Sequence, residues 1–324
     1  MKTIGIFCGG FSSEYAISMN SAETIVSHFP KGYSWVKIKV KKGRWETETN
    51  DGIVGYFDLN TGNVQNANES IPIDAGLIYI HGNPGENGKI QGLLDMLDIP
   101  YINADALSSS LSFDKWYCNQ FLRAFKIPVA SSIFLRKGDA YNTHEMAEAL
   151  GLPLFIKPTN SGSSYGISKV KEEDQIDKGI QTAFREGDSI VLESFLSGTE
   201  VTCGVYRTKK GLQALPLAEI VSQNEFFDYE AKYLGQSEEI VPARIDEALT
   251  LSIQELSKRI YDLLHLRSIA RIDFIVCEGK PYVIEVNTTP GFSTESIVPK
   301  MLACAGISIC DFWTEIFDVE LVTR

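Results

Sequence analysis

Residues 270–291 read ARIDFIVCEGKPYVIEVNTTPG, two alternating segments on either side of Glu278-Gly279-Lys280. Alternation of apolar and polar residues is typical of a half-buried strand, and a short Gly-containing break between two such runs predicts a β-hairpin. A hairpin centred on Gly279 aligns two polar pairs, Asp273 with Glu285 and Arg271 with Asn287. The period of two along a strand puts these four side chains on one face. Phe274 and Ile284 are expected on the opposite, apolar face.

The facing carboxylates of Asp273 and Glu285 suggest a metal site. Like charges directly opposite each other destabilise a strand pair, and a divalent cation between them would remove the conflict. Carboxylate and amide oxygens suit Mg²⁺, which often takes one or two carboxylates and substrate phosphates. We therefore predict that Asp273, Glu285 and Asn287 bind metal; a solvated polar face without metal is the alternative.

The residues around this hairpin favour bound anions. Arg271 beside a metal would stabilise negative charge that develops in a transition state. After the second strand, Asn287-Thr288-Thr289-Pro290-Gly291 predicts a turn. The Gly291 N–H and the Ser296 hydroxyl are placed to bind an anion at the start of the following helix.

A second informative segment, LFIKPTNSGSSYGISKV at 154–170, predicts strand, loop and strand. Lys157 ends the first strand, and the loop offers backbone N–H groups with the hydroxyls of Ser163 and Ser164, which suits phosphate binding. An ordinary flexible loop is the alternative. The G-x-S-x-G match at 162–166 raises a serine hydrolase, but that motif needs a helix after the serine, and a strand follows here.

The rest of the chain predicts an α/β fold with α+β character. Residues 3–8 form a strand, Gly9-Gly10 a turn and 15–28 a helix. Further strands are expected at 34–40, 76–80, 129–135, 153–157, 167–171 and 189–193, and helices at 88–98, 114–125, 173–186, 246–265 and 295–305. Residues 48–75 are expected to form loops and short hairpins. We place domains at 1–102, 103–192 and 193–324.

Some single residues and short segments also attract attention. Glu14 follows the first turn, where it would contact a substrate ammonium or serve as a solvated acid at a helix start. His81 opens a glycine-rich segment at a strand end, in a structural or a ligand-binding role. The charged and aromatic segment 228–233 is either a surface loop or a cover over a site, with Lys232 touching phosphate.

Composition limits the partners. The 324 residues carry 30 Lys and Arg against 42 Asp and Glu, a formal net charge of −12. This acidic balance argues against nucleic acid as a partner, because phosphate binding needs basic surface. No run approaches the roughly 18 apolar residues of a membrane span. We expect a cytoplasmic protein that binds neither nucleic acid nor membrane.

In this order, the segments resemble the D-alanine–D-alanine ligases of the ATP-grasp superfamily. The matching segments are GGFSSE (9–14), HGNPGENGKIQG (81–92), SFDK (112–115), IKPTNSGSSYGISKV (156–170), LESFLSGTE (192–200), DYEAKY (228–233), ARIDF (270–274) and EVNTTPGFSTES (285–296). The resemblance covers essentially the whole chain. It implies an ATP-grasp architecture with an N-terminal Rossmann-like layer, a small central domain and a larger C-terminal domain.

The resemblance implies a role for each nucleotide-site residue. Lys115 and Lys157 would hold the ATP phosphates or the adenine side, with Ser163 and Ser164 in a phosphate-covering loop. The residues implied to line the adenosine pocket are Glu193, Phe195, Leu196 and Glu200. Two Mg²⁺ ions, with Mn²⁺ as an alternative, would bind Asp273, Glu285 and Asn287.

Substrate roles are implied in the same way. Glu14 would bind the ammonium of the first D-alanine and His81 would lie near its carboxylate. Glu14, Ser163 and Tyr233 would link three domains around the site. The residues implied to hold the second substrate's carboxylate and the tetrahedral intermediate are Arg271, Gly291 and Ser296.

The implied activity is ADP-forming ligation of two D-alanines through an acyl phosphate, for peptidoglycan precursor synthesis, by a homodimer. Ala16 and Ser161 stand where the family usually has Glu, which leaves substrate affinity open. Tyr233 favours an amine over a hydroxyl nucleophile. An ATP-grasp ligase for another amino acid or hydroxy acid is one alternative. A nucleotide-binding protein without turnover is another, against which the intact Lys157, Arg271 and hairpin set argues.

Overall fold

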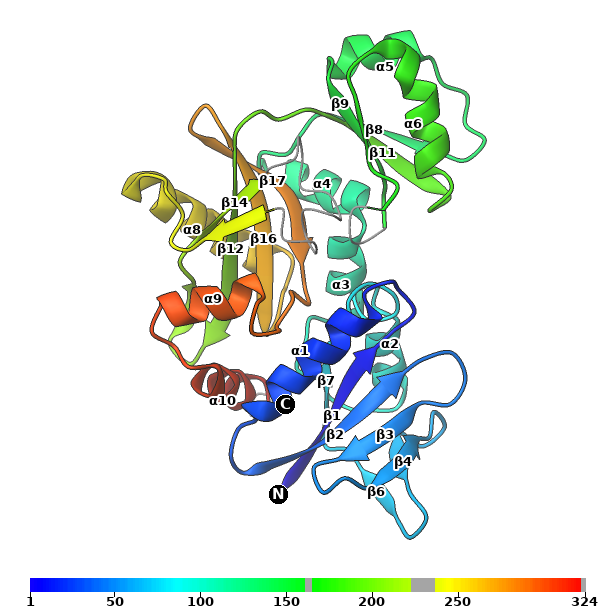
Figure 1. The fold of residues 1–324 in the computed structure, drawn as a ribbon, viewed down its shortest axis with the longest axis vertical. Coiled ribbons are helices and arrows are strands. Elements are labelled where there is room, and N and C mark those ends of the chain that lie inside the picture. The colour runs from blue at the N-terminus through cyan, green and yellow to red at the C-terminus, as the bar shows by residue number, and fades with distance from the viewer. Residues whose placement is uncertain (161–164, 223–236, 322–324) are drawn as a thin grey trace.

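The computed structural model describes residues 1–160, 165–222 and 237–321. Within these ranges the chain forms three β-sheets with helices around them (Figure 1). The predictions for Ser161, Ser163, Ser164, Lys232 and Tyr233 lie outside the described residues.

The N-terminal sheet runs in the order β6-β5-β4-β3-β2-β1-β7. Its strands are β1 (Lys2–Gly9), β2 (Tyr33–Val40), β3 (Glu46–Thr49), β4 (Val54–Phe57), β5 (Asn63–Gln65), β6 (Ser70–Pro72) and β7 (Ala75–Ile78). β1 is parallel to β2 and β7, whereas β2 to β6 form an antiparallel meander. The polar segment 48–75, expected as loops and short hairpins, therefore extends the sheet.

The predicted strand–turn–helix opening is confirmed, with α1 at Tyr15–Ser27. Gly9 and Gly10 have φ values of 92° and 107°. A Cβ on Gly10 would lie 2.5 Å from the Ile80 side chain, and one on Gly9 would lie 2.8 Å from the Val40 carbonyl oxygen. Only glycine fits this turn, because it combines positive φ with close packing.

The small central sheet is antiparallel in the order β10-β9-β11-β8. Its strands are β8 (Ser132–Arg136), β9 (Leu154–Pro158), β10 (Ser168–Val170) and β11 (Ser189–Ser194). Its helices are α5 (Thr143–Leu150), the short 3₁₀ helix η1 (Glu173–Gln175) and α6 (Ile176–Ala183). A core of its own, including Leu154, Ile156, Ile180 and Ile190, holds this unit together.

The C-terminal sheet runs in the order β15-β14-β12-β16-β17, with β13 paired to β12. Its strands are β12 (Thr199–Thr208), β13 (Gly211–Ala214), β14 (Ala218–Ser222), β15 (Ser237–Ile240), β16 (Ile269–Cys277) and β17 (Lys280–Asn287). The remaining helices are α2 (Lys89–Met96), α3 (Ala106–Phe113), α4 (Lys115–Ala124), α8 (Glu247–Leu263), α9 (Ile297–Cys304) and α10 (Ile309–Glu320).

Three helices, α3, α5 and α10, were not predicted. No helix was predicted for the segment ALSSSLSF of α3, which is rich in serine, a residue whose hydroxyl competes with helical hydrogen bonding. Asp105 caps this helix by accepting from the Ser108 N–H, and the buried Ser109 hydroxyl donates to the Ala104 carbonyl oxygen. The apolar period of α10 and the Asn142 cap of α5 were visible in the sequence and were missed.

One hydrophobic core joins the N-terminal and C-terminal sheets. It contains Ile4 and Ile6 of β1 together with Phe292 and the aromatic side chains of α10. Phe317 of α10 packs edge-on against Phe29 and Tyr33. Helix α10 therefore fixes the N-terminal sheet against the C-terminal part of the chain (Figure 1).

Among the described residues, no single helix has the length and apolarity to cross a membrane. Only α9 and α10 taken together have sufficient length and apolarity, and these two helices are bent by 99° at their junction.

Candidate active site

The β16–β17 hairpin pairs Asp273 with Glu285 and Arg271 with Asn287, as predicted. The turn itself differs from the prediction. Cys277 pairs with Lys280 around a two-residue turn, Glu278-Gly279, in which both residues have positive φ. Such a turn matches the natural twist of a hairpin.

A β-bulge restores the predicted pairing. Phe274 pairs with Val283, so Ile284 is the extra residue on β17. Our prediction that Ile284 lies on the apolar face with Phe274 is wrong: Phe274 is buried in the core, whereas Ile284 lines a pocket beside Glu285. A bulge of this kind re-aims a side chain, and its position depends on packing that the hairpin sequence alone does not contain.

The carboxylate of Asp273 is surrounded by donors. Arg271 binds it through two contacts of 2.8 Å, the Thr202 hydroxyl donates at 2.5 Å, and the Asn287 amide nitrogen donates at 3.0 Å. Burial tends to lower the pKa of Arg271, but the carboxylate of Asp273 raises it above its ordinary value. Arg271 and Asp273 thus form a charged pair in the site.

Glu285 pairs with a different cation. Lys115 Nζ lies 3.0 Å from Glu285 Oε1, although the two residues are far apart in the chain. Burial tends to lower the pKa of Lys115, and the Glu285 carboxylate raises it above its usual value. The predicted repulsion between Asp273 and Glu285 is therefore balanced by Arg271 and Lys115 before any metal is considered, which weakens the electrostatic argument for metal.

The donor set still fits a hard divalent cation. Asp273 and Glu285 supply carboxylate oxygens next to each other, and Asn287 adds an amide oxygen. Within the ranges that the structure describes, no three His, Cys, Asp or Glu side chains are arranged so that they could hold a metal ion by themselves. A cation here would need Asn287 and ligands from substrate, as Mg²⁺ commonly does beside phosphates.

A cavity of about 500 Å³ opens beside the hairpin. The predicted nucleotide and hairpin residues in its wall are Lys115, Lys157, Glu193, Phe195, Leu196, Glu200, Arg271, Asp273 and Glu285. Apolar side chains, among them Phe155 and Ile275, form another part of the wall. The volume lies in the range of roughly 300–1,000 Å³ typical of small-molecule sites.

Lys157 and the buried Glu193 form a largely enclosed ion pair on the central sheet. Lys157 Nζ lies 2.8 Å from Glu193 Oε2, and the Asn119 amide donates to Glu193 Oε1 at 2.9 Å. Lys157 lies near the end of β9, as predicted. Asn119 was missed, although it lies one helical turn after Lys115 on the same face of α4.

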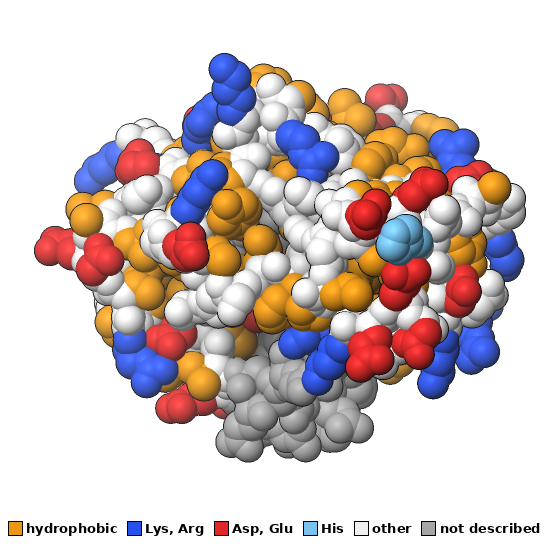
Figure 2. Space-filling view, turned by 90° about the horizontal axis from the view of Figure 1, so that it is seen from above, with side chains coloured by type: hydrophobic (Ala, Val, Ile, Leu, Met, Phe, Trp, Pro, Cys, Tyr) orange, Lys and Arg blue, Asp and Glu red, His pale blue; other side chains and the backbone are white. Residues whose placement is uncertain are grey.

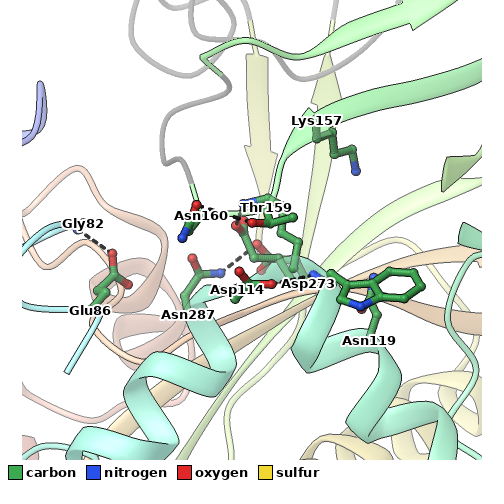
Figure 3. A network of polar contacts seen from close by, with 12 residues as sticks. Gly82, Glu86, Asp114, Asn119, Lys157, Thr159, Asn160, Asp273 and Asn287 are labelled. Atoms are coloured by element: carbon green, nitrogen blue, oxygen red, sulfur yellow. Dashed lines mark hydrogen bonds and ion pairs between the residues drawn. The ribbon is translucent and has the colours of Figure 1, made fainter. Parts of the chain in front are cut away.

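The glycine-rich segment after β7 places a buried acid, Glu86, near Glu14. The Gly82 N–H donates to Glu86 Oε2 at 2.7 Å, and a Cβ on Gly82 would lie 3.5 Å from Glu14 Oε2. Burial raises the pKa of Glu86 to about 8, and the neighbouring Glu14 carboxylate adds to this rise. Figure 3 shows Glu86 turned back toward Gly82, with Asn287 and Asp273 between it and Lys157. Glu86 was not among the predicted site residues.

His81 is buried with both ring nitrogens in hydrogen bonds. Nδ1 lies 2.9 Å from the Thr289 carbonyl oxygen and Nε2 lies 3.2 Å from the Ser21 hydroxyl. The structure therefore brings His81 to the turn after β17.

Gly291 and Ser296 lie together, as the anion-binding prediction requires. A Cβ on Gly291 would lie 3.0 Å from Ser296 Oγ. Ser296 is the N-cap residue of α9 but makes no side-chain cap; its hydroxyl instead accepts from the Ser293 N–H at 3.1 Å.

Thr202 was also missed. It lies opposite Asp273 because β12 pairs with β16, a pairing between distant segments that local patterns do not reveal.

Ala16, one of the departures from the family pattern, is exposed in the first turn of α1. On the face in Figure 2, basic and acidic side chains are interspersed.

Known proteins match this chain along nearly its whole length. The family model described as D-ala D-ala ligase N-terminus matches residues 3–104, and that described as D-ala D-ala ligase C-terminus matches residues 121–318. A D-alanine–D-alanine ligase of Bacteroides fragilis is 43% identical over 319 residues, which is 98% of each chain.

Two solved structures are also similar. D-alanyl-alanine synthetase A of Vibrio cholerae has a TM-score of 0.88 and 31% identity, covering 99% of this chain and 98% of that chain. The Bacillus anthracis D-alanine–D-alanine ligase in complex with ATP has a TM-score of 0.81 and 29% identity, covering 100% and 99%.

The three sheets, with the pocket between the central and C-terminal sheets, define an ATP-dependent ligase with the ATP-grasp fold. The chain belongs to the D-alanine–D-alanine ligase family. It joins D-alanines with ATP in cell wall synthesis.

Proposed function

We propose that the 500 Å³ cavity binds ATP and that ligation proceeds through an acyl phosphate. The observation that carries this proposal is the composition of the cavity wall. Phe155, Phe195, Leu196 and Ile275 offer apolar surface for a purine, while Lys115 and Lys157 supply positive charge for phosphates. The two acids of the hairpin lie in the same wall, where the terminal phosphate would meet the first substrate.

In the proposed reaction the carboxylate of the first D-alanine attacks the γ-phosphorus, and ADP leaves. The amine of the second D-alanine then attacks the acyl carbon, and phosphate leaves with the former carboxylate oxygen. A carboxylate accepts an amine poorly, so ATP supplies the leaving group. Glu14 binds the first ammonium, and Arg271, Gly291 and Ser296 hold the second carboxylate and the tetrahedral intermediate.

Asp273, Glu285 and Asn287 hold two Mg²⁺ ions, or Mn²⁺ in their place. When bound, these ions neutralise charge on the phosphates during transfer. Lys115, which pairs with Glu285 in this structure, is one of the protein's own cations for the same phosphates, whereas Arg271, which pairs with Asp273, serves the second carboxylate and the intermediate.

The remaining assignments complete the proposal. Ser163, Ser164 and Lys232 contact phosphate, and Tyr233 joins Glu14 and Ser163 in linking the domains. The substrate domain comprises residues 1–102, the lid domain 103–192, and the metal and nucleotide domain 193–324. The protein is a cytoplasmic homodimer, and sedimentation would measure the mass of the dimer.

Isotope transfer tests the acyl phosphate. D-alanine labelled with ¹⁸O in its carboxylate is incubated with ATP and Mg²⁺, and phosphate and dipeptide are analysed by mass spectrometry. We expect one labelled oxygen in each phosphate released, together with D-alanyl-D-alanine. Unlabelled phosphate would show that water, not the carboxylate, attacks ATP. A panel of D- and L-amino acids and hydroxy acids in the same assay defines the second substrate.

A further inference from the structure

A chain of hydrogen bonds connects helix α1 to the turn that follows β17. The Phe292 N–H donates to Ser21 Oγ at 3.1 Å, Ser21 Oγ lies 3.2 Å from His81 Nε2, and His81 Nδ1 lies 2.9 Å from the Thr289 carbonyl oxygen. Beside it, the Tyr79 hydroxyl donates to the Pro290 carbonyl oxygen at 3.0 Å. All these groups are buried.

The chemistry of each group sets the direction of the chain. A carbonyl oxygen only accepts, so His81 Nδ1 carries the proton that it shares with Thr289. Ser21 Oγ accepts from the Phe292 N–H, which leaves its own hydrogen to donate to His81 Nε2. Burial lowers the pKa of His81, which agrees with a neutral ring holding one proton. Both ring nitrogens are therefore committed to protein partners.

The turn held in this way contains Gly291, the residue adjacent to Ser296. The backbone on both sides of Gly291 is bound by side chains of the N-terminal unit. His81 and Tyr79, which follow β7, bind the Thr289 and Pro290 carbonyl oxygens, and Ser21 of α1 accepts from the Phe292 N–H. Because those partners belong to the N-terminal unit, the position of Gly291 depends on that unit as well as on β17.

We propose that Ser21 and His81 are positioning residues that hold the 288–292 turn so that Gly291 and Ser296 receive the carboxylate of the second D-alanine. This inference rests on the proposed function, in which Gly291 and Ser296 form that subsite. It differs from the expectation that His81 lies against the carboxylate of the first substrate.

Replacing Ser21 separates positioning of the turn from contact with the first substrate. Ser21 reaches the turn only through the backbone of Phe292 and through His81. In Ser21→Ala we expect the KM for the second D-alanine to rise about tenfold, the effect of losing one buried hydrogen-bond partner. The KM values for ATP and for the first D-alanine stay within twofold of wild type. Initial rates over a wide range of D-alanine concentration give both D-alanine constants.

The matched control is Thr24→Val, which removes a hydroxyl from the same helix. Thr24 Oγ1 donates only within α1, to the Asn20 carbonyl oxygen at 3.1 Å. This variant keeps wild-type constants, and its melting temperature shows how much a lost hydroxyl in α1 costs in stability.

His81→Asn completes the design. An Asn amide nitrogen can replace Nδ1 as donor to Thr289 but does not reach Ser21. If the two residues act through one chain, Ser21→Ala, His81→Asn and the double variant raise the same KM to a similar extent, so their effects do not add.

Three results would overturn the inference. One is a wild-type second-site KM in Ser21→Ala. Another is an effect of His81→Asn confined to the first D-alanine, which would place His81 on that substrate. The third is a rise of all constants together with a fall in melting temperature, which would indicate a structural role only. Failure of the proposed function looks different, since the wild-type protein would then transfer no ¹⁸O to phosphate.

Discussion

Asp273 and Glu285 are partners across the β16–β17 hairpin, yet each carboxylate pairs with a different cation. Arg271 binds Asp273 from the same strand, while Lys115 reaches Glu285 from the start of α4. Both cations also line the cavity proposed for ATP. A triphosphate that attracts Lys115, and a second substrate that attracts Arg271, would release the two acids for Mg²⁺. The same four side chains are thus balanced without nucleotide and suited to metal with it.

The first prediction concerns the charge of Glu285. In Glu285→Gln we expect kcat to fall at least 100-fold, because the variant loses a proposed metal ligand and the partner of Lys115. Phosphate release with saturating ATP, D-alanine and Mg²⁺ measures this loss. The far-UV circular dichroism spectrum stays that of the wild type.

Glu278→Gln is the control for this change. Glu278 lies in the exposed turn of the same hairpin, so its charge has no part in the proposed site. It keeps wild-type turnover. Substantial activity in Glu285→Gln would remove Glu285 from the metal assignment.

The second prediction concerns Lys157 and nucleotide affinity. Lys157→Met removes a positive charge from the cavity wall and leaves Glu193 with Asn119 as partner. We expect the Kd for ATP, measured calorimetrically, to rise about 10-fold to 100-fold, as for the loss of one charge-assisted contact to phosphate. Lys137→Met, at an exposed position of the central unit, keeps the wild-type Kd. Equal affinity in both variants would place the phosphates elsewhere.

The third prediction concerns pH. Burial, reinforced by Glu14, raises the pKa of Glu86 to about 8 in the folded protein, above the ordinary value of 4.5. Between these values the folded state keeps a proton that the unfolded chain has lost, so this group lowers the free energy of unfolding as pH rises. Glu86→Gln cannot ionise and escapes this loss. Relative to wild type, its melting temperature should rise by about 2 °C or more from pH 5 to pH 8.

Thermal unfolding at several pH values, without substrates, measures this difference. Glu69→Gln, at an exposed position just before β6, serves as control and should differ from wild type equally at every pH. A constant difference for Glu86→Gln as well would mean that Glu86 ionises as a solvent-exposed glutamate does.

The fourth prediction compares two ion pairs on helix α10. Glu320 is buried, binds the Arg267 guanidinium and accepts from the Ser268 N–H at 2.9 Å. Glu320→Gln leaves Arg267 without its counter-charge and should lower the free energy of unfolding by about 3 kcal/mol. Asp318→Asn breaks the exposed pair with Lys209 and should cost less than about 1 kcal/mol. Urea unfolding measures both, and equal costs would show that burial of this pair is unimportant.

Local patterns predicted the hairpin well, although partly through compensating errors. The expected turn, centred on Gly279, was one residue too long, and the bulge at Ile284 added one residue back, so Asp273 still met Glu285. Alternation and turn residues determine short-range pairing. A bulge depends on the surfaces against which each strand packs, and those surfaces come from other parts of the chain.

The sequence by itself determined the strands of the central sheet, three strands of the N-terminal sheet, most helices, the glycine turn after β1, the two acids of the hairpin and the family resemblance. Only the tertiary structure decided that Lys115 meets Glu285, that Thr202 donates to Asp273, and that His81 binds the backbone of Thr289. The physical reason is range. Alternation, helical period and turn chemistry act over a few residues, whereas these contacts join segments tens to hundreds of residues apart, brought together only when the three sheets and their cores assemble.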